Sequence, residues 1–367
     1  MKITAIRAYA VVLPYVGGTY SWSGGYSASE ALSTVVEVET DSGLTGYGES
    51  CPLPSYLEAY GEGVPTGVQS LAPALIGADP RELDRINRLM DRTILGHAYA
   101  KSPIDVACWD ILGKACDMPV HMLLGGRFHD AMPMYRAVPQ QDPDSMAGLV
   151  AEYRAEGYRQ FQLKSGGAPD DEIARIRAVA DSLEPGEILI ADANRGWTRE
   201  EAIRVARALW DVDVIIEQPC DGYEACRSVR RRIGHALKLD ECVTDMAVLQ
   251  RAIADDALDM LSVKISRFGG LTAARRVRDI CTAAEIPMTV EDVWGGAVVS
   301  AAVAHLAAST QPEVLKNTTD LHNYNSVHFA GDAPEVRGGC LVPPDRPGLG
   351  VTPDLDVLGD PLFEITG

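Results

Sequence analysis

The chain has 367 residues, of which 46% are hydrophobic and 23% charged, as is usual for a globular protein with room for two domains. Its formal charge of −19 argues against a nucleic acid or an anionic membrane as partner, because like charges repel. No apolar run approaches the ~20 residues of a membrane span, and the eight scattered cysteines are typical of a cytoplasmic protein.

The first 127 residues predict a separate α+β domain. Alternating apolar residues indicate strands over residues 3–12, 31–40 and 45–49, and helical spacing indicates helices over residues 67–75, 81–95 and 102–115. Two loops, residues 16–26 and 52–63, are rich in small and aromatic side chains. Such loops suit a lid over a small substrate.

From residue 128 onwards, short apolar runs alternate with helical patterns, and each run ends in a polar residue. Beginning with the second run, these residues are Lys164, Asp192, Glu217, Asp240, Lys264, Asp292 and Asn317, at steps of 23 to 28 residues. Each step has room for one strand, one helix and two short loops. Thr198, followed three residues later by Glu201, is a capping box that predicts the start of one of these helices.

Strands that alternate with helices at this period indicate parallel pairing and right-handed crossovers. We therefore predict a (β/α)8-type (TIM-like, modified) barrel over residues 128–330, whose active site lies at the C-terminal ends of its strands. The alternative is an open doubly wound sheet, but the glycine-rich phosphate loop expected after its first strand is absent. Residues 331–367, rich in Gly and Pro, are expected to return to the first domain.

Three of the strand ends, Asp192, Glu217 and Asp240, would bring carboxylates to one point. Carboxylates this close repel each other unless a cation lies between them. Ligation by oxygen alone selects a hard divalent ion, most simply Mg²⁺. Lys164 and Lys264 lie on strand ends at either side of the three carboxylates. A lysine in a closed site near a metal has a lowered pKa and can act as a general base.

The whole chain resembles the enolase superfamily, in its muconate lactonizing enzyme branch. The segments that carry the resemblance are Gln162-Leu163-Lys164, Asp192-Ala193-Asn194, Glu217-Gln218-Pro219, Asp240-Glu241, Lys264-Ile265-Ser266 and Asp292-Val293-Trp294-Gly295-Gly296. The resemblance implies an N-terminal capping domain, Mg²⁺ and a lysine that removes the α-proton of a carboxylate. Many members have Lys-x-Lys where this chain has Gln162 and Lys164, which argues against the cycloisomerase and dipeptide epimerase families.

Within the superfamily, four motifs resemble those of cis-3-hydroxy-L-proline dehydratases. These are Gln162 with Lys164, Tyr99-Ala100-Lys101, the segment from Asp292 to Gly296, and Asn317-Thr318-Thr319-Asp320-Leu321. Such an enzyme forms an enediolate and expels the 3-hydroxyl, giving 1-pyrroline-2-carboxylate. Hydroxyproline betaine 2-epimerases share two of the motifs, so a proline or hydroxyproline betaine 2-epimerase, or another amino-acid racemase, is the alternative. A degenerate barrel that only binds a ligand is disfavoured, because all three carboxylates and both lysines are retained.

The resemblance assigns a role to each of these residues. We expect Lys164 as general base and Lys264 as general acid on the opposite face of the substrate ring, with Asp192, Glu217 and Asp240 as metal ligands. The residues expected to contact the substrate are Tyr56, Gln162, Asn194, Glu241, Asp292, Trp294, Asn317 and Thr318. The expected partner is a small imino or amino acid, and the protein is expected to be a homo-oligomer.

Overall fold

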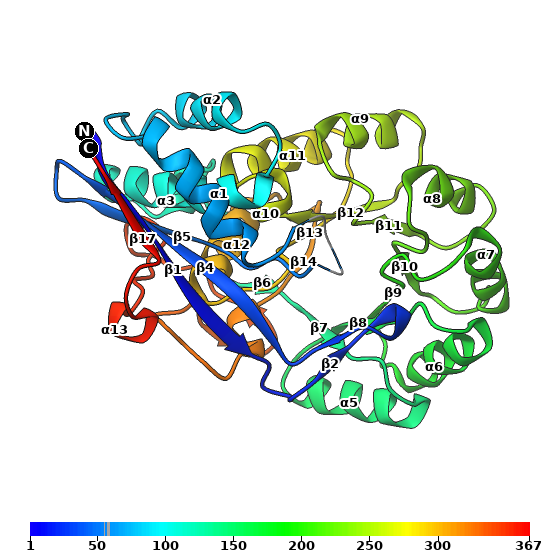
Figure 1. Cartoon of the computed structure of the whole chain (residues 1–367). Helices are drawn as coiled ribbons and strands as arrows, with labels where there is room; N and C mark the ends of the chain where they lie inside the picture. The colour runs from blue at the N-terminus through cyan, green and yellow to red at the C-terminus, as the bar shows by residue number, and fades with distance from the viewer. Residues whose placement is uncertain (55, 57–58) are drawn as a thin grey trace.

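The computed structural model describes residues 1–54, 56 and 59–367 and contains a parallel barrel beside a smaller antiparallel sheet (Figure 1). The barrel strands are β7 (Tyr135–Val138), β8 (Gln160–Lys164), β9 (Ile188–Asp192), β10 (Ile215–Glu217), β11 (Leu237–Leu239), β12 (Met260–Lys264), β13 (Met288–Glu291) and β14 (Leu315–Thr318). They are neighbours in chain order, and a parallel bridge between Met134 and Thr318 joins the two edges. The predicted barrel is confirmed.

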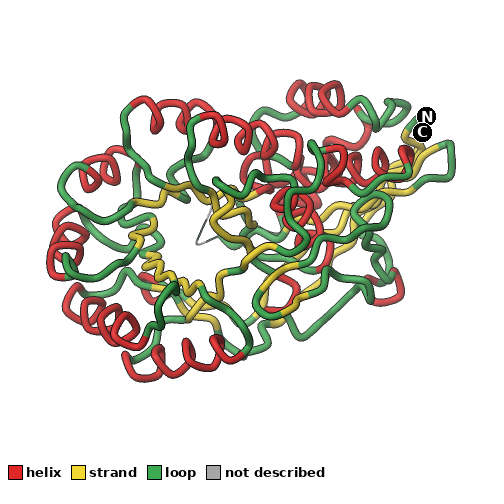
Figure 2. Tube along the Cα trace, turned by 180° about the vertical axis from the view of Figure 1, so that it is seen from behind, coloured by secondary structure: helices red, strands yellow, loops and turns green. Residues whose placement is uncertain are grey.

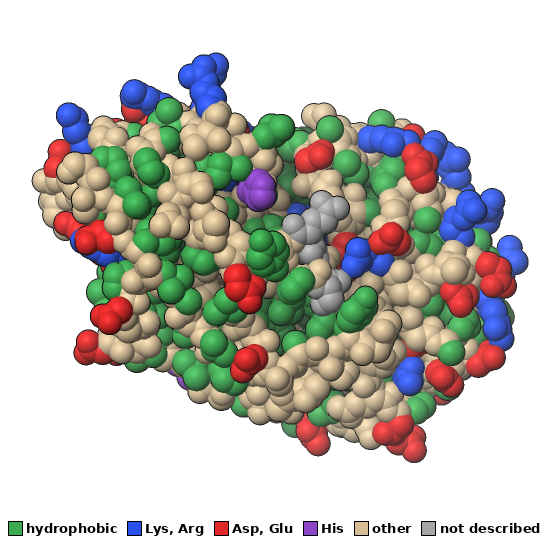
Figure 3. Space-filling model, in the orientation of Figure 1, with side chains coloured by type: hydrophobic (Ala, Val, Ile, Leu, Met, Phe, Trp, Pro, Cys, Tyr) green, Lys and Arg blue, Asp and Glu red, His purple; other side chains and the backbone are tan. Residues whose placement is uncertain are grey.

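Helices surround the barrel strands on the outside (Figure 2). They are α5 (Pro143–Ala155), α6 (Pro169–Ser182), α7 (Arg199–Ala208), α8 (Tyr223–Arg230), α9 (Met246–Ala254), α10 (Ile265–Phe268), α11 (Leu271–Ala283) and α12 (Ala297–Ala308). Helix α7 begins with the predicted capping box of Thr198 and Glu201. The last strand is followed by a short 3-10 helix, Leu321–Tyr324, in place of an eighth barrel helix. Lys and Arg side chains gather over α7, α8 and α9 on the face seen in Figure 3.

The antiparallel sheet has the strand order β17-β1-β4-β5 and is covered by helices of the N-terminal region. Its strands are β1 (Ile3–Pro14), β4 (Glu30–Thr40), β5 (Thr45–Ser50) and β17 (Phe363–Thr366), and the helices are α1 (Gly63–Leu71), α2 (Leu83–Thr93) and α3 (Ala98–Cys116). Strand β17 pairs with β1, so the two chain ends lie side by side (Figure 1). The domain boundaries at residues 127 and 330 stay a prediction.

The remaining elements are short. They are β2 (Tyr20–Ser21), β3 (Ser27–Ala28), α4 (Val120–Leu123), β6 (Met132–Pro133), β15 (Val336–Arg337), β16 (Cys340–Leu341) and α13 (Leu355–Leu358). Residues 132–138 form two strands, because β6 pairs with β16 and only β7 joins the barrel. In the described part of the chain, no helix is both long and apolar enough to cross a membrane.

Two buried carboxylates hold the antiparallel sheet and its helices on the barrel. Glu49, at the end of β5, accepts hydrogen bonds from the backbone N–H groups of Gly296 and Val299 at 2.6 and 3.0 Å. Asp105 of α3 accepts one from the N–H of Thr272 at 2.9 Å. Both therefore satisfy unpaired N–H groups at the N-termini of barrel helices, where the helix dipole also favours negative charge.

Candidate active site

The strand register places the predicted catalytic and metal-binding residues side by side. Lys164 pairs with Asp192 across β8 and β9, and Asp192 pairs with Glu217 across β9 and β10. Lys164 Nζ lies 2.6 Å from Asp192 Oδ2, and Lys264 Nζ lies 2.5 Å from Asp240 Oδ2. All five residues are at most 7% exposed. The structure therefore brings these residues together in a buried cluster of alternating charge.

Glu217 is the most deeply enclosed of the three carboxylates. Its Oε1 lies 2.9 Å from both Lys238 Nζ and Ser262 Oγ, and its Oε2 accepts a hydrogen bond from Gln162 Nε2 at 2.9 Å. Burial raises the pKa of Glu217 to about 7. Lys238 lowers this pKa, whereas the nearby carboxylates of Asp192, Asp240 and Glu291 raise it. A nearby cation would relieve this unfavourable crowding of negative charge.

Asp240 is held by two cations. Arg267 Nη1 donates to its Oδ1 at 2.6 Å, while Lys264 approaches the other oxygen. Burial opposes the charge, but Arg267 and Lys264 outweigh burial and hold the pKa of Asp240 well below its usual value. Asp240 is therefore ionised at any pH at which an enzyme works.

Both catalytic candidates are held as ammonium ions in this structure. Burial disfavours the charge on Lys164, but Asp192 outweighs burial, and the pKa of Lys164 lies well above its usual value. Asp240 and Glu291 have the same effect on the pKa of Lys264. The pKa values are raised because each lysine forms a direct ion pair with a buried carboxylate. The lowered pKa expected of a lysine beside a bound metal stays a prediction.

Asp192, Glu217 and Asp240 match a hard cation in chemistry, since they supply only carboxylate oxygens from three adjacent strands. Among the described residues, however, no group of three or more His, Cys, Asp or Glu is arranged as a ready metal site. Asp192 and Asp240 each direct an oxygen at a lysine instead. Metal binding therefore requires these two carboxylates to exchange or share their lysine contacts.

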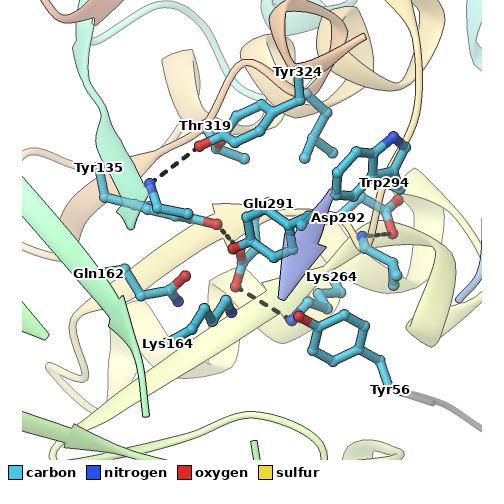
Figure 4. A pocket seen from close by; sticks show the side chains of 14 residues that line it. Tyr56, Tyr135, Gln162, Lys164, Lys264, Glu291, Asp292, Trp294, Thr319 and Tyr324 are labelled. Carbon is cyan, nitrogen blue, oxygen red and sulfur yellow. Dashed lines mark hydrogen bonds and ion pairs between the residues drawn. The ribbon is translucent and has the colours of Figure 1, made fainter. Parts of the chain in front are cut away.

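A pocket lies against this cluster, and Figure 4 shows both lysines facing it. It is lined by Tyr20, Tyr56, Tyr135, Ala137, Gln162, Lys164, Lys264, Glu291, Asp292, Val293, Trp294, Thr319, Leu321 and Tyr324. Four of the predicted substrate contacts are among them, namely Tyr56, Gln162, Asp292 and Trp294. The Tyr56 ring lies under the Lys164 ammonium, with 5.4 Å between Nζ and the ring centroid.

The other predicted substrate contacts do not line this pocket. Asn194 donates to Glu241 Oε1 at 3.0 Å, and Glu241 lines a wider neighbouring cleft. Inside the barrel, Asn317 accepts a hydrogen bond from the Thr289 hydroxyl and donates one to Gln160 Oε1. The Thr318 hydroxyl donates to a backbone carbonyl of β13. The next residue, Thr319, lies at the pocket instead. The roles of Asn194, Glu241, Asn317 and Thr318 in substrate binding stay predictions.

Tyr20, an aromatic residue of the first predicted lid loop, lines the pocket. The Trp294 ring meets the rings of Tyr15 and Tyr20 edge-on, with centroids 5.9 and 5.8 Å apart. Trp22 stacks on Tyr56 at 5.0 Å. Segment 16–26 therefore contributes Tyr20 to the pocket wall, and its role as a lid stays a prediction. Of the second predicted lid segment, residues 55 and 57–58 lie outside the described residues.

Sequence reasoning missed Glu291, Lys238, Ser262 and Tyr135. The signal was the two-residue period of a strand, on which alternate side chains share a face. Lys238 precedes Asp240 by two positions, and Ser262 precedes Lys264 by two, so each pair points the same way. Glu291 pairs with Lys264 in register and stands directly before Asp292, the residue that was predicted from the same strand.

Comparison with known proteins shows which families and relatives this chain matches. Residues 145–357 match the family described as enolase C-terminal domain-like. Residues 25–125 match the mandelate racemase/muconate lactonizing enzyme N-terminal domain. The cis-3-hydroxy-L-proline dehydratase of Roseibium aggregatum is 51% identical over 363 residues, which are 99% of each chain.

Solved structures agree over the full chain. A mandelate racemase/muconate lactonizing enzyme from Roseovarius nubinhibens is 49% identical with a TM-score of 0.97, covering 100% of this chain and 98% of the other. A member of the enolase superfamily from the same organism, complexed with magnesium, is 38% identical with a TM-score of 0.95, and both chains are fully covered.

The Lys238–Glu217 ion pair yields a prediction about stability, because both side chains are fully buried. Lys238→Met leaves buried Glu217 without its cation, so the carboxyl is either charged and unpaired or protonated far above its usual pKa. The free energy of unfolding should therefore fall by about 3–5 kcal/mol in urea with EDTA present. Adding Glu217→Gln should recover most of this loss. Exposed Lys2→Met is the control and should change stability by less than ~0.5 kcal/mol. A double variant as unstable as Lys238→Met alone would show that the pair is not coupled.

Proposed function

Because the chain belongs to the mandelate racemase/muconate lactonizing enzyme family of the enolase superfamily, we propose that it is a Mg²⁺-dependent cis-3-hydroxy-L-proline dehydratase. The observation that carries the proposal is a pair of buried lysines, each bound to a different carboxylate and both facing one pocket. The full-length likeness to the Roseibium aggregatum dehydratase supports this substrate. The homo-oligomeric state and the cytoplasmic location stay predictions.

Asp192, Glu217 and Asp240 would hold the metal ion. When bound, Mg²⁺ would supply positive charge that offsets these carboxylates and stabilises the negative charge developing on the substrate carboxylate. Gln162 and Ser262 hydrogen-bond the two oxygens of Glu217 and so fix the orientation of that carboxylate. Such supporting contacts keep a ligand set in place.

The two lysines divide the proton transfers between the two faces of the ring. In cis-3-hydroxy-L-proline the α-proton and the 3-hydroxyl lie on opposite faces, as an anti elimination requires. Lys164, in its neutral form, takes the α-proton on Nζ, and the electrons of the broken C–H bond form an enediolate. These electrons then form the C2–C3 double bond as the C3–O bond breaks. Lys264 gives a proton to the departing hydroxyl, which leaves as water.

The product of these steps is an enamine, which tautomerises to 1-pyrroline-2-carboxylate. Lys264 suits the acid role because Asp240 and Glu291 keep it protonated. Tyr56, Trp294 and Tyr324 give the pocket apolar walls that exclude water from the enediolate. Protonation of the same intermediate from the opposite face would give epimerisation, which is the competing outcome.

Removing the metal should abolish activity. We expect EDTA to stop dehydration and Mg²⁺ to restore it, because negative charge on the substrate carboxylate would be unsupported without a cation. Asp192→Asn should weaken Mg²⁺ binding roughly tenfold or more in calorimetry, while its circular dichroism spectrum stays that of the wild type. Exposed Asp144→Asn is the matched control. Full turnover of thoroughly metal-free enzyme would rule out the ligand assignment.

Either Lys164→Ala or Lys264→Ala should reduce kcat by a factor of ~10² or more, the scale of a lost general acid or base. In D₂O, Lys264→Ala should still exchange the α-proton while dehydration falls, because Lys164 remains as the base. Lys164→Ala should lose both reactions. Exchange measured by NMR and water loss measured by mass spectrometry separate the two steps. Near-normal turnover in either variant would make that lysine a structural charge.

The function itself is tested with purified enzyme, Mg²⁺ and a panel of proline derivatives. cis-3-Hydroxy-L-proline should lose water and leave a cyclic imine that reacts with o-aminobenzaldehyde. The trans isomer should react poorly, because its hydroxyl lies on the same ring face as the base. L-Proline, which has no leaving group, should show at most slow exchange or racemisation. Fast epimerisation of proline betaines without dehydration of the 3-hydroxy acid would establish the epimerase instead.

A further inference from the structure

Glu291 brings a negative charge to the pocket that has no substrate contact in the proposed mechanism. It ends β13, is 2% exposed, and lies between Tyr135 and Lys264 in Figure 4. Its Oε2 accepts a hydrogen bond from the Tyr135 hydroxyl at 2.5 Å. Its Oε1 has no hydrogen-bond partner among the described residues, and Lys264 Nζ lies 3.6 Å away.

The carboxyl of Glu291 is ionised. Burial alone would raise its pKa, but Lys264 and Lys238 outweigh burial, and the pKa of Glu291 is lowered. A buried carboxylate oxygen without a donor is unfavourable, so buried acceptors at ligand sites commonly receive their hydrogen bond from the ligand. Oε1 is therefore suited to a ligand that carries a charged N–H donor.

The neighbouring carboxylate, Asp292, is already engaged. Its Oδ2 accepts from the Ser266 N–H at 3.0 Å, and its Oδ1 accepts from the Val293 N–H at 2.8 Å and from the Ser266 hydroxyl. The remaining charged side chains that line the pocket are Lys164 and Lys264, and both would repel an ammonium group. A zwitterionic imino acid needs an anion there, and Glu291 supplies it.

We propose that Glu291 Oε1 accepts a hydrogen bond from the ring ammonium of the substrate and thereby selects imino acids over ring carboxylates without a positive charge. The inference rests on the proposed function for its substrate class. Tyr135 holds the other oxygen and so aims Oε1. A charge-assisted hydrogen bond of this kind is stronger than a neutral one.

The test compares two ligands that differ at one ring atom. L-Proline carries the ammonium, and (S)-tetrahydrofuran-2-carboxylate has an ether oxygen in its place, with the same ring size and carboxylate. Calorimetry on the Mg²⁺-loaded full chain should show wild-type enzyme binding proline at least ~10-fold more tightly, the scale of one charge-assisted hydrogen bond. Glu291→Gln should reduce this preference to less than ~3-fold, whereas Asp292→Asn should keep it.

A second variant covers the case in which Glu291→Gln does not fold. Glu291→Asp keeps the charge but withdraws it by one methylene, so an intermediate preference is expected. A wild-type enzyme without preference, or a preference that survives in Glu291→Gln, overturns the proposal. Loss of the preference in Trp294→Phe with retention in Glu291→Gln would assign the ammonium to the aromatic wall and also overturn it. Because neither ligand is turned over by dehydration, failure of the dehydratase assignment is recorded separately in the substrate panel.

Discussion

Buried carboxylates at the mouth of the barrel determine where the rest of the site must place positive charge. Glu217, Asp240 and Glu291 are nearly inaccessible to water, where an isolated charge would cost several kcal/mol or more. Each is accompanied by a cation from a neighbouring strand end or helix, namely Lys238, Arg267 or Lys264. Charge is thus balanced within the cluster, and any ion or ligand that enters must rearrange existing ion pairs.

The same principle fixes the antiparallel sheet and its helices over the site. Glu49 and Asp105 are buried carboxyl groups that accept hydrogen bonds from helix N-termini of the barrel, although burial outweighs these bonds and raises the pKa of both. A side chain at Gly270 would place Cβ 2.4 Å from an oxygen of Asp105, and the φ of +119° there favours glycine in any case. Close approach of α3 to the start of α11 therefore depends on this glycine.

The sequence predicted the barrel and its catalytic strand ends because each barrel strand from the second onwards stops at or just before a polar residue. It did not identify Glu291 or Lys238, because parallel strands are largely apolar on both faces. The remaining signals were the two-residue spacing of Lys238 from Asp240 and the position of Glu291 directly before Asp292. At the end of β14, the sequence alone did not tell which of Asn317, Thr318 and Thr319 faces the pocket. The sequence also did not show that Lys164 and Lys264 form ion pairs with Asp192 and Asp240. These are tertiary contacts, and they raise the pKa of each lysine in a way that burial alone does not reveal.

The two lysines differ in the number of carboxylates close to them, and this difference orders their proposed roles. Lys164 has one carboxylate partner, Asp192, and otherwise contacts the face of the Tyr56 ring. Lys264 lies near two carboxylates, Asp240 and Glu291. If the charge of Asp192 and Asp240 is shared with a metal, Lys164 loses its carboxylate partner, whereas Lys264 keeps Glu291. Lys164 then gives up its proton more readily, so the base belongs on β8 and the acid on β12.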